Sequence, residues 1–167
     1  MSRAFVKDHE GDADDALPEL PLSENPNYVT PHGVALLRER LATMHARRDA
    51  LKVSDDDTLA EQRELSSLER DLRWLNARVA NAIEVDLSKQ PHDRVAFGAT
   101  VTVDSEDGEH RWQIVGEDEA DVEHGLVSYV SPLAQALLGA RVGDEVRWHR
   151  PAGDMTIEVV SIEYADT

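Results

Sequence analysis

Three consecutive acids, Asp55, Asp56 and Asp57, stand between two stretches of the chain that both have helical periodicity. Ser54 or one of these acids is suited to cap the second helix, because their side-chain oxygens accept hydrogen bonds from the free N–H groups of a first turn. Carboxylates at this end of a helix also favour its dipole by about 0.3 to 1 kcal/mol each. From their position alone, the three acids predict a capped or solvated turn.

Basic side chains accompany the acids along the same two stretches. Arg63 and Arg70 are seven residues apart and so share one face of a helix. Acids lie close to them in the sequence, and Arg63 is placed to pair with Glu64 or Glu69. Ordinary ion pairing along two packed helices is therefore the first interpretation of these bases. They are Arg47, Arg48, Lys52, Arg63, Arg70 and Arg73.

The remaining side chains give no sign of a catalytic centre. The seven histidines are scattered without the close spacing of a metal site, so we expect surface or packing roles for them. Ser131 precedes Pro132 and is expected to cap a helix, since no Gly-x-Ser-x-Gly sequence marks it as a nucleophile. The chain has no Cys, which excludes disulfides and Cys-based zinc sites and favours a reducing cytoplasm.

The composition narrows the class of protein. Of 167 residues, 41% are hydrophobic, which suffices for a packed core. Acids number 34 against 17 bases, and the net charge of -17 excludes non-specific binding of nucleic acid by the whole surface. No apolar run approaches the roughly 20 residues of a membrane span, and the first residues lack the apolar region of a secretory signal. We therefore expect a cytoplasmic protein without membrane contact.

The chain divides into three segments by charge and pattern. Residues 1–27 carry seven acids, two bases and three prolines with little periodicity, which predicts an acidic, disordered tail. Within it, residues 17–22 could lie extended against a partner or a neighbouring domain. Residues 28–86 are nearly neutral, whereas residues 87–167 are again strongly acidic. Such a shift often marks a change of architecture.

Residues 28–86 predict a helical hairpin. Thr30 is a suitable N-cap, and Pro31 tolerates the first helical position, where its missing N–H costs nothing. Two arms of about 20 and 26 residues then carry apolar positions at alternating spacings of three and four, the heptad pattern of packed helices. We expect an antiparallel two-helix coiled coil with an acidic tip. The seam positions are Val34, Leu37, Leu41, Met44 and Leu51 in one arm and Leu65, Leu68, Leu72, Leu75, Val79 and Ala82 in the other.

Residues 87–167 alternate short β patterns with turn signals. Asp107 and Gly108 supply a hairpin turn, and Gly139 ends a short helix that begins after Ser131. These patterns predict an antiparallel sheet of about five strands carrying one helix, an α+β domain. The expected strands are residues 95–103, 111–115, 125–130, 145–149 and 155–164, and the expected helix is residues 132–138.

Several unusual segments follow one another in a distinctive order. The run from Ser131 to Asp144, SPLAQALLGARVGD, is preceded by an FGA strand and an IVG strand and followed by a PAG turn and a closing IEY. Upstream, YVTPHG at residues 28–33 begins the hairpin and IEVD at residues 83–86 ends it. Together these segments resemble the GreA/GreB family of bacterial transcription elongation factors, over about residues 28–164.

This resemblance implies a fold and a partner. Family members have an N-terminal coiled-coil hairpin, here residues 28–86, and an FKBP-like C-terminal domain, here residues 87–167. The domain docks on bacterial RNA polymerase beside the secondary channel, and the hairpin enters that channel. The chain is then an accessory factor and not an enzyme, is expected to be a monomer, and meets DNA only through the elongation complex. The implied docking residues, three of which also suit turns, are Ser131, Pro132, Leu133, Gly139, Gly143 and Asp144.

The resemblance also assigns chemistry to the tip. In cleavage-stimulating members, tip carboxylates help to hold a second Mg²⁺ and a water at the polymerase active centre, which hydrolyses the 3′ end of a backtracked transcript. Asp55, Asp56 and Asp57 are the candidate catalytic residues and Mg²⁺ ligands, only in complex with polymerase. The protein alone is expected to bind no cofactor, and at most two of the three acids can share one ion. The candidate contacts to nascent RNA are Arg47, Arg48, Lys52 and Arg63.

The tip departs from the family's pattern. It lacks the Asp-x-x-Glu of the cleavage-stimulating members, whose acids would fall at Leu51 and Ser54 in an ungapped alignment from the second helix. The hairpin is also shorter than the family's norm. Two functions stay open: a factor that promotes transcript cleavage, and a secondary-channel regulator that binds polymerase without stimulating cleavage. A prolyl isomerase, suggested by the FKBP-like fold alone, is disfavoured because aromatic residues make up only 5% of the chain.

Overall fold

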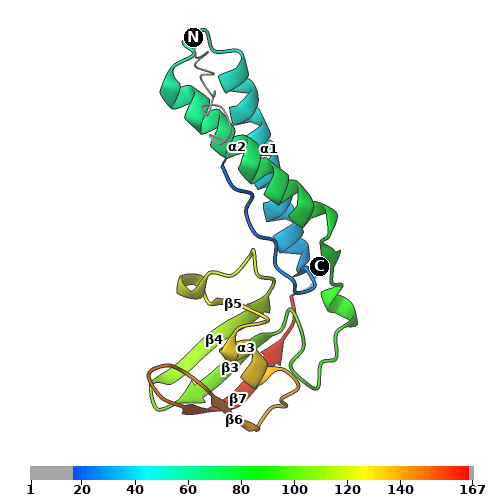
Figure 1. The fold of residues 1–167 in the computed structure, drawn as a ribbon. Helices are drawn as coiled ribbons and strands as arrows, with labels where there is room; N and C mark the ends of the chain where they lie inside the picture. The colour runs from blue at the N-terminus through cyan, green and yellow to red at the C-terminus, as the bar shows by residue number, and fades with distance from the viewer. Residues whose placement is uncertain (1–16, 166–167) are drawn as a thin grey trace, which may run out of the picture.

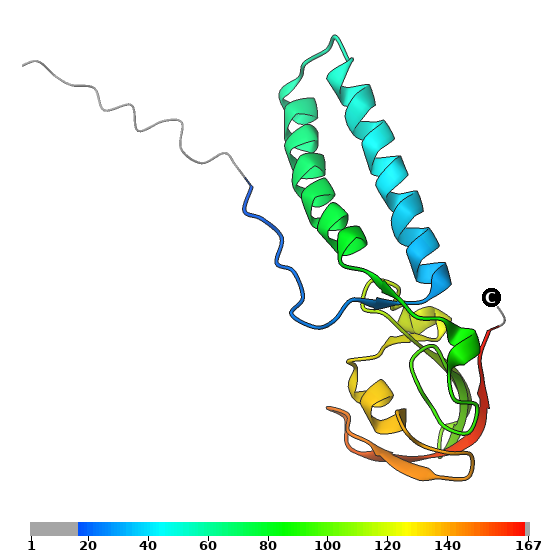
Figure 2. The same ribbon diagram turned by 90° about the vertical axis from the view of Figure 1, so that its right-hand side faces the viewer.

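The computed structural model describes residues 17–165. Two long antiparallel helices project from a small domain built on a curled sheet, as Figures 1 and 2 show from two sides. The hairpin comes first in the chain and the sheet domain second, so the predicted α+β architecture is confirmed. Within the described part of the chain, no helix is long and apolar enough to cross a membrane.

The hairpin consists of α1 (Pro31–Lys52) and α2 (Leu59–Ala80), each 22 residues long. Thr30 caps α1 as predicted, and its hydroxyl accepts a hydrogen bond from the Gly33 N–H at 3.0 Å. The second arm is shorter than the predicted 26 or so residues because the chain leaves the helix at Asn81. It then forms a short strand beside the residues that precede α1.

That short strand is β2 (Ile83–Glu84), which pairs parallel to β1 (Tyr28–Val29). The pairing ties together the two ends of the hairpin where they enter the sheet domain. Val29 is 3% exposed and packs in one apolar cluster with Leu37 and Leu75 of the two helices. The base of the hairpin is therefore closed by backbone and side chains together.

The cap of α2 differs from the prediction. Thr58, and neither Ser54 nor any of residues 55–57, is the N-cap. Its hydroxyl accepts the Glu61 N–H at 3.2 Å, and the Glu61 carboxylate accepts the Thr58 N–H at 3.2 Å. This reciprocal pair satisfies two N–H groups at once, which a single capping acid would not.

The predicted seam is where the two helices meet. Leu72 and Leu75 of α2 are 3% and 1% exposed, and Leu37 of α1 is 5% exposed. Near the tip, Leu51 is also buried. The spacing of three and four thus places these leucines between the helices, where their burial holds the hairpin closed.

The sheet has five strands in the order β5-β4-β3-β7-β6. Pairing is antiparallel throughout except that β5 runs parallel to β4, so the sheet is mixed and not purely antiparallel as predicted. The reason is the connection of residues 116–125, whose short helix η2 (Val122–His124) brings the chain back before β5 begins. The strands are β3 (Thr100–Ser105), β4 (Gly108–Val115), β5 (Leu126–Ser128), β6 (Glu145–Trp148) and β7 (Met155–Glu163).

One short helix, α3 (Pro132–Leu137), packs on the sheet and completes the core. A single turn, η1 (Leu87–Lys89), links the hairpin to this domain, and Leu87 is 2% exposed. In the sheet, β3 begins at Thr100, five residues later than predicted, because Gly98 adopts a φ of 87° and turns the chain just before the strand. The buried core residues are Val95, Ala99, Val101, Val103, Ile114, Val127, Leu133, Ala134, Leu137, Ala140, Ile157 and Val159.

Residues 17–27 lie extended beside the hairpin, which corrects the prediction that they belong to a disordered tail. The indole N–H of Trp74 in α2 donates to the Pro21 carbonyl at 3.2 Å. Asn27 is buried at the base of the hairpin. Residues 1–16 of the predicted tail lie outside the described residues.

Candidate functional site

The loop between the helices carries the three predicted acids at the end of the hairpin far from the sheet (Figure 1). Asp57 has a φ of 34°, and its carboxylate accepts a hydrogen bond from the Gln62 amide at 3.0 Å. Asp55 and Asp56 are exposed, and neither carboxylate joins an ion pair or a hydrogen bond within residues 17–165. The tip therefore holds one committed carboxylate and two free ones.

Leu51 and Ser54, which stand where the family's two tip acids would fall, both make contacts within the hairpin. Leu51 is buried between the helices. The Ser54 hydroxyl donates to Glu61 at 3.0 Å, so that Glu61 joins the turn to the cap of α2. The tip is ordered by this network, and the free acids project beyond it.

The tip can contribute to a cation site but does not complete one. Over the described residues, no group of three or more His, Cys, Asp and Glu side chains is placed to hold a metal ion. Asp55 and Asp56 offer hard oxygen donors, which suit Mg²⁺ in sites where it takes one or two carboxylates and keeps several waters. Two carboxylates alone do not complete the coordination of such an ion.

Arg47, a candidate RNA contact, is committed to an acid of the other helix. Its guanidinium donates to both carboxylate oxygens of Glu64, at 2.7 and 2.9 Å. This hydrogen bonding holds the pKa of Glu64 below its ordinary value and raises the pKa of Arg47. Both side chains remain about half exposed, so water screens the pair.

The other candidate RNA contacts differ in whether an acid of the protein already pairs with them. Lys52 lies 3.7 Å from Glu69, and Arg48 lies 3.3 Å from its neighbour Asp49. The two acids predicted as partners of Arg63 are thus paired with bases of α1. Within the described chain Arg63 makes no ion pair, and it lines a groove near the tip.

The first half of the predicted docking set lies at the start of α3. The Ser131 hydroxyl accepts the Ala134 N–H at 3.3 Å, which confirms it as the helix cap. Pro132 is exposed at the first helical position, whereas Leu133 is 4% exposed and belongs to the core. Only the first two of these residues present surface to a partner.

The second half of the docking set shapes turns. Gly139 and Gly143 have φ values of 85° and 90°, a region that side chains disfavour. The Asp144 carboxylate accepts the Arg141 N–H at 2.9 Å and closes the turn before β6. Gly139, Gly143 and Asp144 hold the shape of the domain, as predicted from their suitability for turns.

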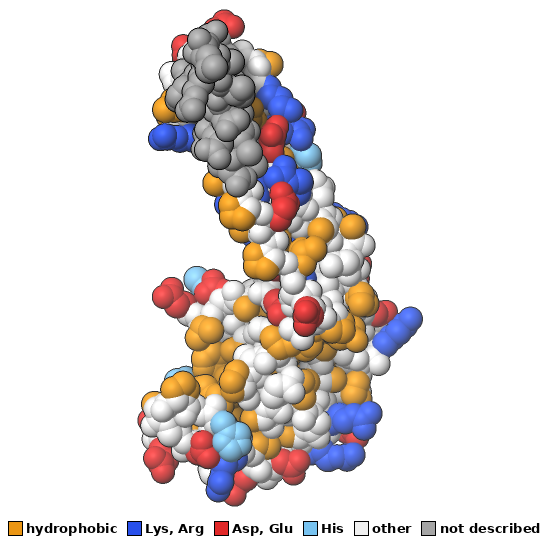
Figure 3. All heavy atoms as spheres, viewed as in Figure 1, with side chains coloured by type: hydrophobic (Ala, Val, Ile, Leu, Met, Phe, Trp, Pro, Cys, Tyr) orange, Lys and Arg blue, Asp and Glu red, His pale blue; other side chains and the backbone are white. Residues whose placement is uncertain are grey.

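Ser131, Pro132 and Leu133 line a groove of about 460 Å³ whose exposed wall is almost wholly apolar. Figure 3 shows hydrophobic side chains gathered on this side of the domain, at the left of the view. Trp112 and Trp148 also line the groove, although the sequence analysis did not assign either residue to docking. The other lining residues are Val122, Val127, His149, Arg150, Pro151 and Ala152.

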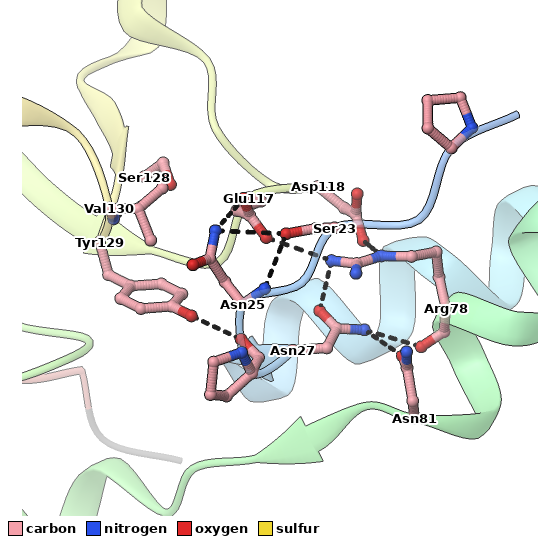
Figure 4. Close-up of polar contacts among 12 residues, drawn as sticks. Ser23, Asn25, Asn27, Arg78, Asn81, Glu117, Asp118, Ser128, Tyr129 and Val130 are labelled. Atoms are coloured by element: carbon pink, nitrogen blue, oxygen red, sulfur yellow. Dashed lines mark hydrogen bonds and ion pairs between the residues drawn. The ribbon is translucent and has the colours of Figure 1, made fainter.

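A second site, the junction of hairpin and domain, had no signal in the sequence. Arg78 of α2 is 1% exposed and lies among three polar partners (Figure 4). It donates to Asp118 at 2.7 Å and to Asn27 at 2.7 Å, and lies 3.8 Å from Glu117. A buried guanidinium requires such partners, because an unpaired buried charge is strongly destabilising.

The same loop of the domain also holds α1. Glu119 is 8% exposed and accepts the Thr30 hydroxyl at 2.6 Å. Its other oxygen lies 2.9 Å from His32 Nδ1. At the start of this loop, a Cβ on Gly116 would lie 2.2 Å from the Tyr28 carbonyl oxygen, so only glycine permits this close approach.

Comparisons with known proteins agree with this arrangement of hairpin and domain. A family model described as "Transcription elongation factor, GreA/GreB, C-term" matches residues 90–164. The transcription elongation factor GreB of Neisseria meningitidis serogroup B is 34% identical over 157 residues, which cover 85% of this chain and 96% of that protein. This chain belongs to the GreA/GreB family.

Other relatives of this Gre-family elongation factor give the same result. The transcription elongation factor GreA of Francisella philomiragia is 36% identical over 152 residues, 81% of this chain and 95% of that protein. Among solved structures, the GreA factor homolog Gfh1 of Thermus thermophilus matches 83% of this chain and 99% of its own at 24% identity and a TM-score of 0.39. That structural likeness is too distant to carry any functional argument.

The family match covers the sheet domain of this Gre-family protein. Residues 90–164 include α3, the apolar groove and the loop that holds both helices. The tip acids lie outside that match, at the other end of the hairpin. The family match therefore covers the candidate docking residues but not the tip acids.

Proposed function

We propose that this elongation factor binds RNA polymerase through its C-terminal domain and places its hairpin in the secondary channel. There it promotes cleavage of the transcript 3′ end in backtracked, arrested complexes. The observation that carries this proposal is the pair of free carboxylates, Asp55 and Asp56, at the far end of an ordered hairpin. The names of the GreA and GreB relatives support the elongation role itself.

The dimensions of the hairpin suit this task. Each helix has 22 residues, which corresponds to about 33 Å at the rise of an α-helix. The apolar groove lies in the domain at one end, and the acids lie at the other. Docking by the groove thus leaves the tip free to reach a distant centre.

The tip acts by donating ligands to a site that belongs to the polymerase. Asp55 and Asp56 would provide carboxylate oxygens for a Mg²⁺ shared with that site, and this ion would activate a water for hydrolysis of the phosphodiester. Asp57 keeps its hydrogen bond to Gln62 and supports the turn. The protein alone therefore needs no bound metal.

A second function is favoured by one observation at the tip. Leu51 and Ser54 occupy the positions implied for the family's acids, and both are engaged within the hairpin. If Asp55 and Asp56 stand too far from the active centre, the protein would occupy the channel and regulate polymerase without stimulating cleavage.

A transcript cleavage assay on backtracked complexes from the source organism distinguishes the two functions. The proposal predicts that the full protein shortens the transcript and releases a 3′ fragment. Binding to polymerase without such shortening would favour the channel-occupying regulator. Absence of binding would contradict both.

A further inference from the structure

The junction between hairpin and domain has few polar contacts, and they are unevenly placed. Within the described chain, the ion pairs and side-chain hydrogen bonds from α2 to the C-terminal domain all come from Arg78. The corresponding contact from α1 comes from His32, which lies 2.9 Å from Glu119. Thr30, the N-cap of α1, donates its hydroxyl to the other oxygen of Glu119. Both helices are thus held by the consecutive acids of a single loop, Glu117 to Glu119.

Arg78 also connects a third segment to this junction. Its Nη2 donates to the Asn27 side chain, and the Asn27 amide donates back to the Arg78 carbonyl at 2.8 Å. Asn25, two residues earlier, donates to Glu117 at 3.2 Å. The N-terminal segment, α2 and the domain therefore meet around one guanidinium, as Figure 4 shows.

Burial makes this arrangement sensitive to its geometry. The Arg78 side chain is 1% exposed and that of Asp118 is 12% exposed. The Arg78 Nη1 and Glu117 Oε2 atoms are buried without a hydrogen-bond partner in the described residues. Any swing of α2 away from the loop would leave charges unpaired in a place that excludes water, which is unfavourable.

We propose that Arg78 is a positioning residue that fixes the direction of the hairpin relative to the docking domain. The inference rests on the proposed function, because the direction of the hairpin decides where the tip acids lie once the domain has docked. Arg78 touches neither substrate nor metal. It acts by holding α2 on the loop of Glu117 and Asp118 while the N-terminal segment closes over it.

The direction of the hairpin relative to the domain can be measured directly. Because the chain has no Cys, two introduced cysteines would be the only sites that a thiol-reactive spin label modifies. Val53→Cys near the tip and Glu106→Cys in the turn after β3 both lie at exposed positions. Double electron–electron resonance between spin labels at these positions reports the spread of tip-to-domain distances in the full protein. We expect one narrow distribution.

Arg78→Met should widen that distribution about twofold, because it leaves Asp118 without its buried counterion. Arg78→Lys keeps the charge as a single point donor and should give an intermediate width. Arg73→Met removes the exposed pair with Glu19 and is the matched control, with a width equal to the wild type. Circular dichroism and thermal unfolding check that each variant is folded.

Asp118→Ala is the second variant, since it breaks the same pair from the domain side and should widen the distribution equally. In cleavage assays, Arg78→Met should lower the rate at saturation about tenfold and leave the half-saturating concentration nearly unchanged, with partial recovery in Arg78→Lys. A folded Arg78→Met or Asp118→Ala protein with the wild-type width would overturn the inference. Wild-type protein that does not stimulate cleavage would contradict the proposed function, while the distance measurement still decides this inference.

Discussion

At the residue scale, the same carboxylate group has different roles that depend on its surroundings. Asp55 and Asp56 are exposed and unengaged in the described structure, which makes them available to a partner. Asp118, whose side chain is 12% exposed, and the buried Glu119 are both bonded to residues at the base of the hairpin, which makes them structural. Both sets occur as runs of acids in the sequence, so type and spacing alone do not separate them. The two sets are distinguished by their burial and by their hydrogen-bond partners.

The Arg47–Glu64 pair gives a prediction for titration. The pKa of Glu64 is lowered by its hydrogen bonds from Arg47, so the pair stabilises the hairpin above the ordinary glutamate pKa. That contribution is lost as the pH falls through the lowered value in the folded protein. In ¹³C NMR titrations, Arg47→Met should raise the Glu64 pKa towards its ordinary value, and an unchanged pKa would show that the pair does not form in solution.

The bases near the tip give a second prediction. Arg63 is unpaired in the described structure, whereas Arg47 is held by two hydrogen bonds, so Arg63 is better placed to contact a phosphate of extruded RNA. Arg63→Gln should lower photo-crosslinking of a backtracked RNA 3′ end to the hairpin about threefold, as one lost phosphate contact would. Arg47→Gln is the control and should have little effect. Equal losses would mean that Arg47 leaves Glu64 in the complex.

At the element scale, the hairpin depends on its seam. Leu72 is 3% exposed between the helices, so Leu72→Asp would bury an unpaired charge there at a cost of about 3 kcal/mol or more. In a Trp74→Phe background, which removes the tryptophan of α2, circular dichroism should show loss of helix while the fluorescence of Trp112 and Trp148 keeps its folded signal. Leu36→Asp, at a position that is 41% exposed, should leave the helices intact. Simultaneous loss of both signals would show that hairpin and domain unfold as one unit.

Local sequence signals explain how much of each element could be predicted. The heptad spacing identified the seam, and Thr30 with Pro31 identified the start of α1, because both signals act over a few residues. The cap of α2 was missed because five adjacent residues, 54–58, all have capping side chains, and only the position of Glu61 favours Thr58 among them. The parallel pairing of β5 depends on how the connection folds back, which no short pattern specifies.

At the scale of the whole molecule, the docking groove and the junction are both assembled from distant parts of the chain. Trp112 and Trp148 meet beside α3 only after the sheet has formed. Arg78 finds Asp118 forty residues away along the chain. The resemblance to a known family singled out the segment of α3 as a candidate for docking, but neither of these juxtapositions has a local signal in the sequence.

The groove gives a prediction for polymerase binding. Val122 is 65% exposed and lines the groove, so Val122→Asp places a charge on an apolar docking surface without disturbing the core. We expect about tenfold weaker binding to polymerase, as for a central apolar contact. Val142→Asp, at a position that is 61% exposed and outside the groove, is the matched control. Equal affinities for the two variants would place docking elsewhere on the protein.

The proposed function requires that the free carboxylates at the tip serve the active centre of the polymerase. The most direct measurement compares transcript cleavage in backtracked complexes by wild-type protein, by the double variant Asp55→Asn and Asp56→Asn, and by Asp57→Asn. Asn at position 57 still accepts from Gln62 and tolerates the positive φ of 34°, so this variant keeps the turn and changes only a committed carboxylate.

Polymerase affinity is measured in parallel for all three proteins, and it should be equal because the proposed docking surface lies in the domain and not at the tip. The double variant should lose cleavage, since amide oxygens are poor substitutes for carboxylates as Mg²⁺ ligands, while Asp57→Asn should retain most of it. Full cleavage by the double variant at normal affinity would show that Asp55 and Asp56 do not serve the active centre.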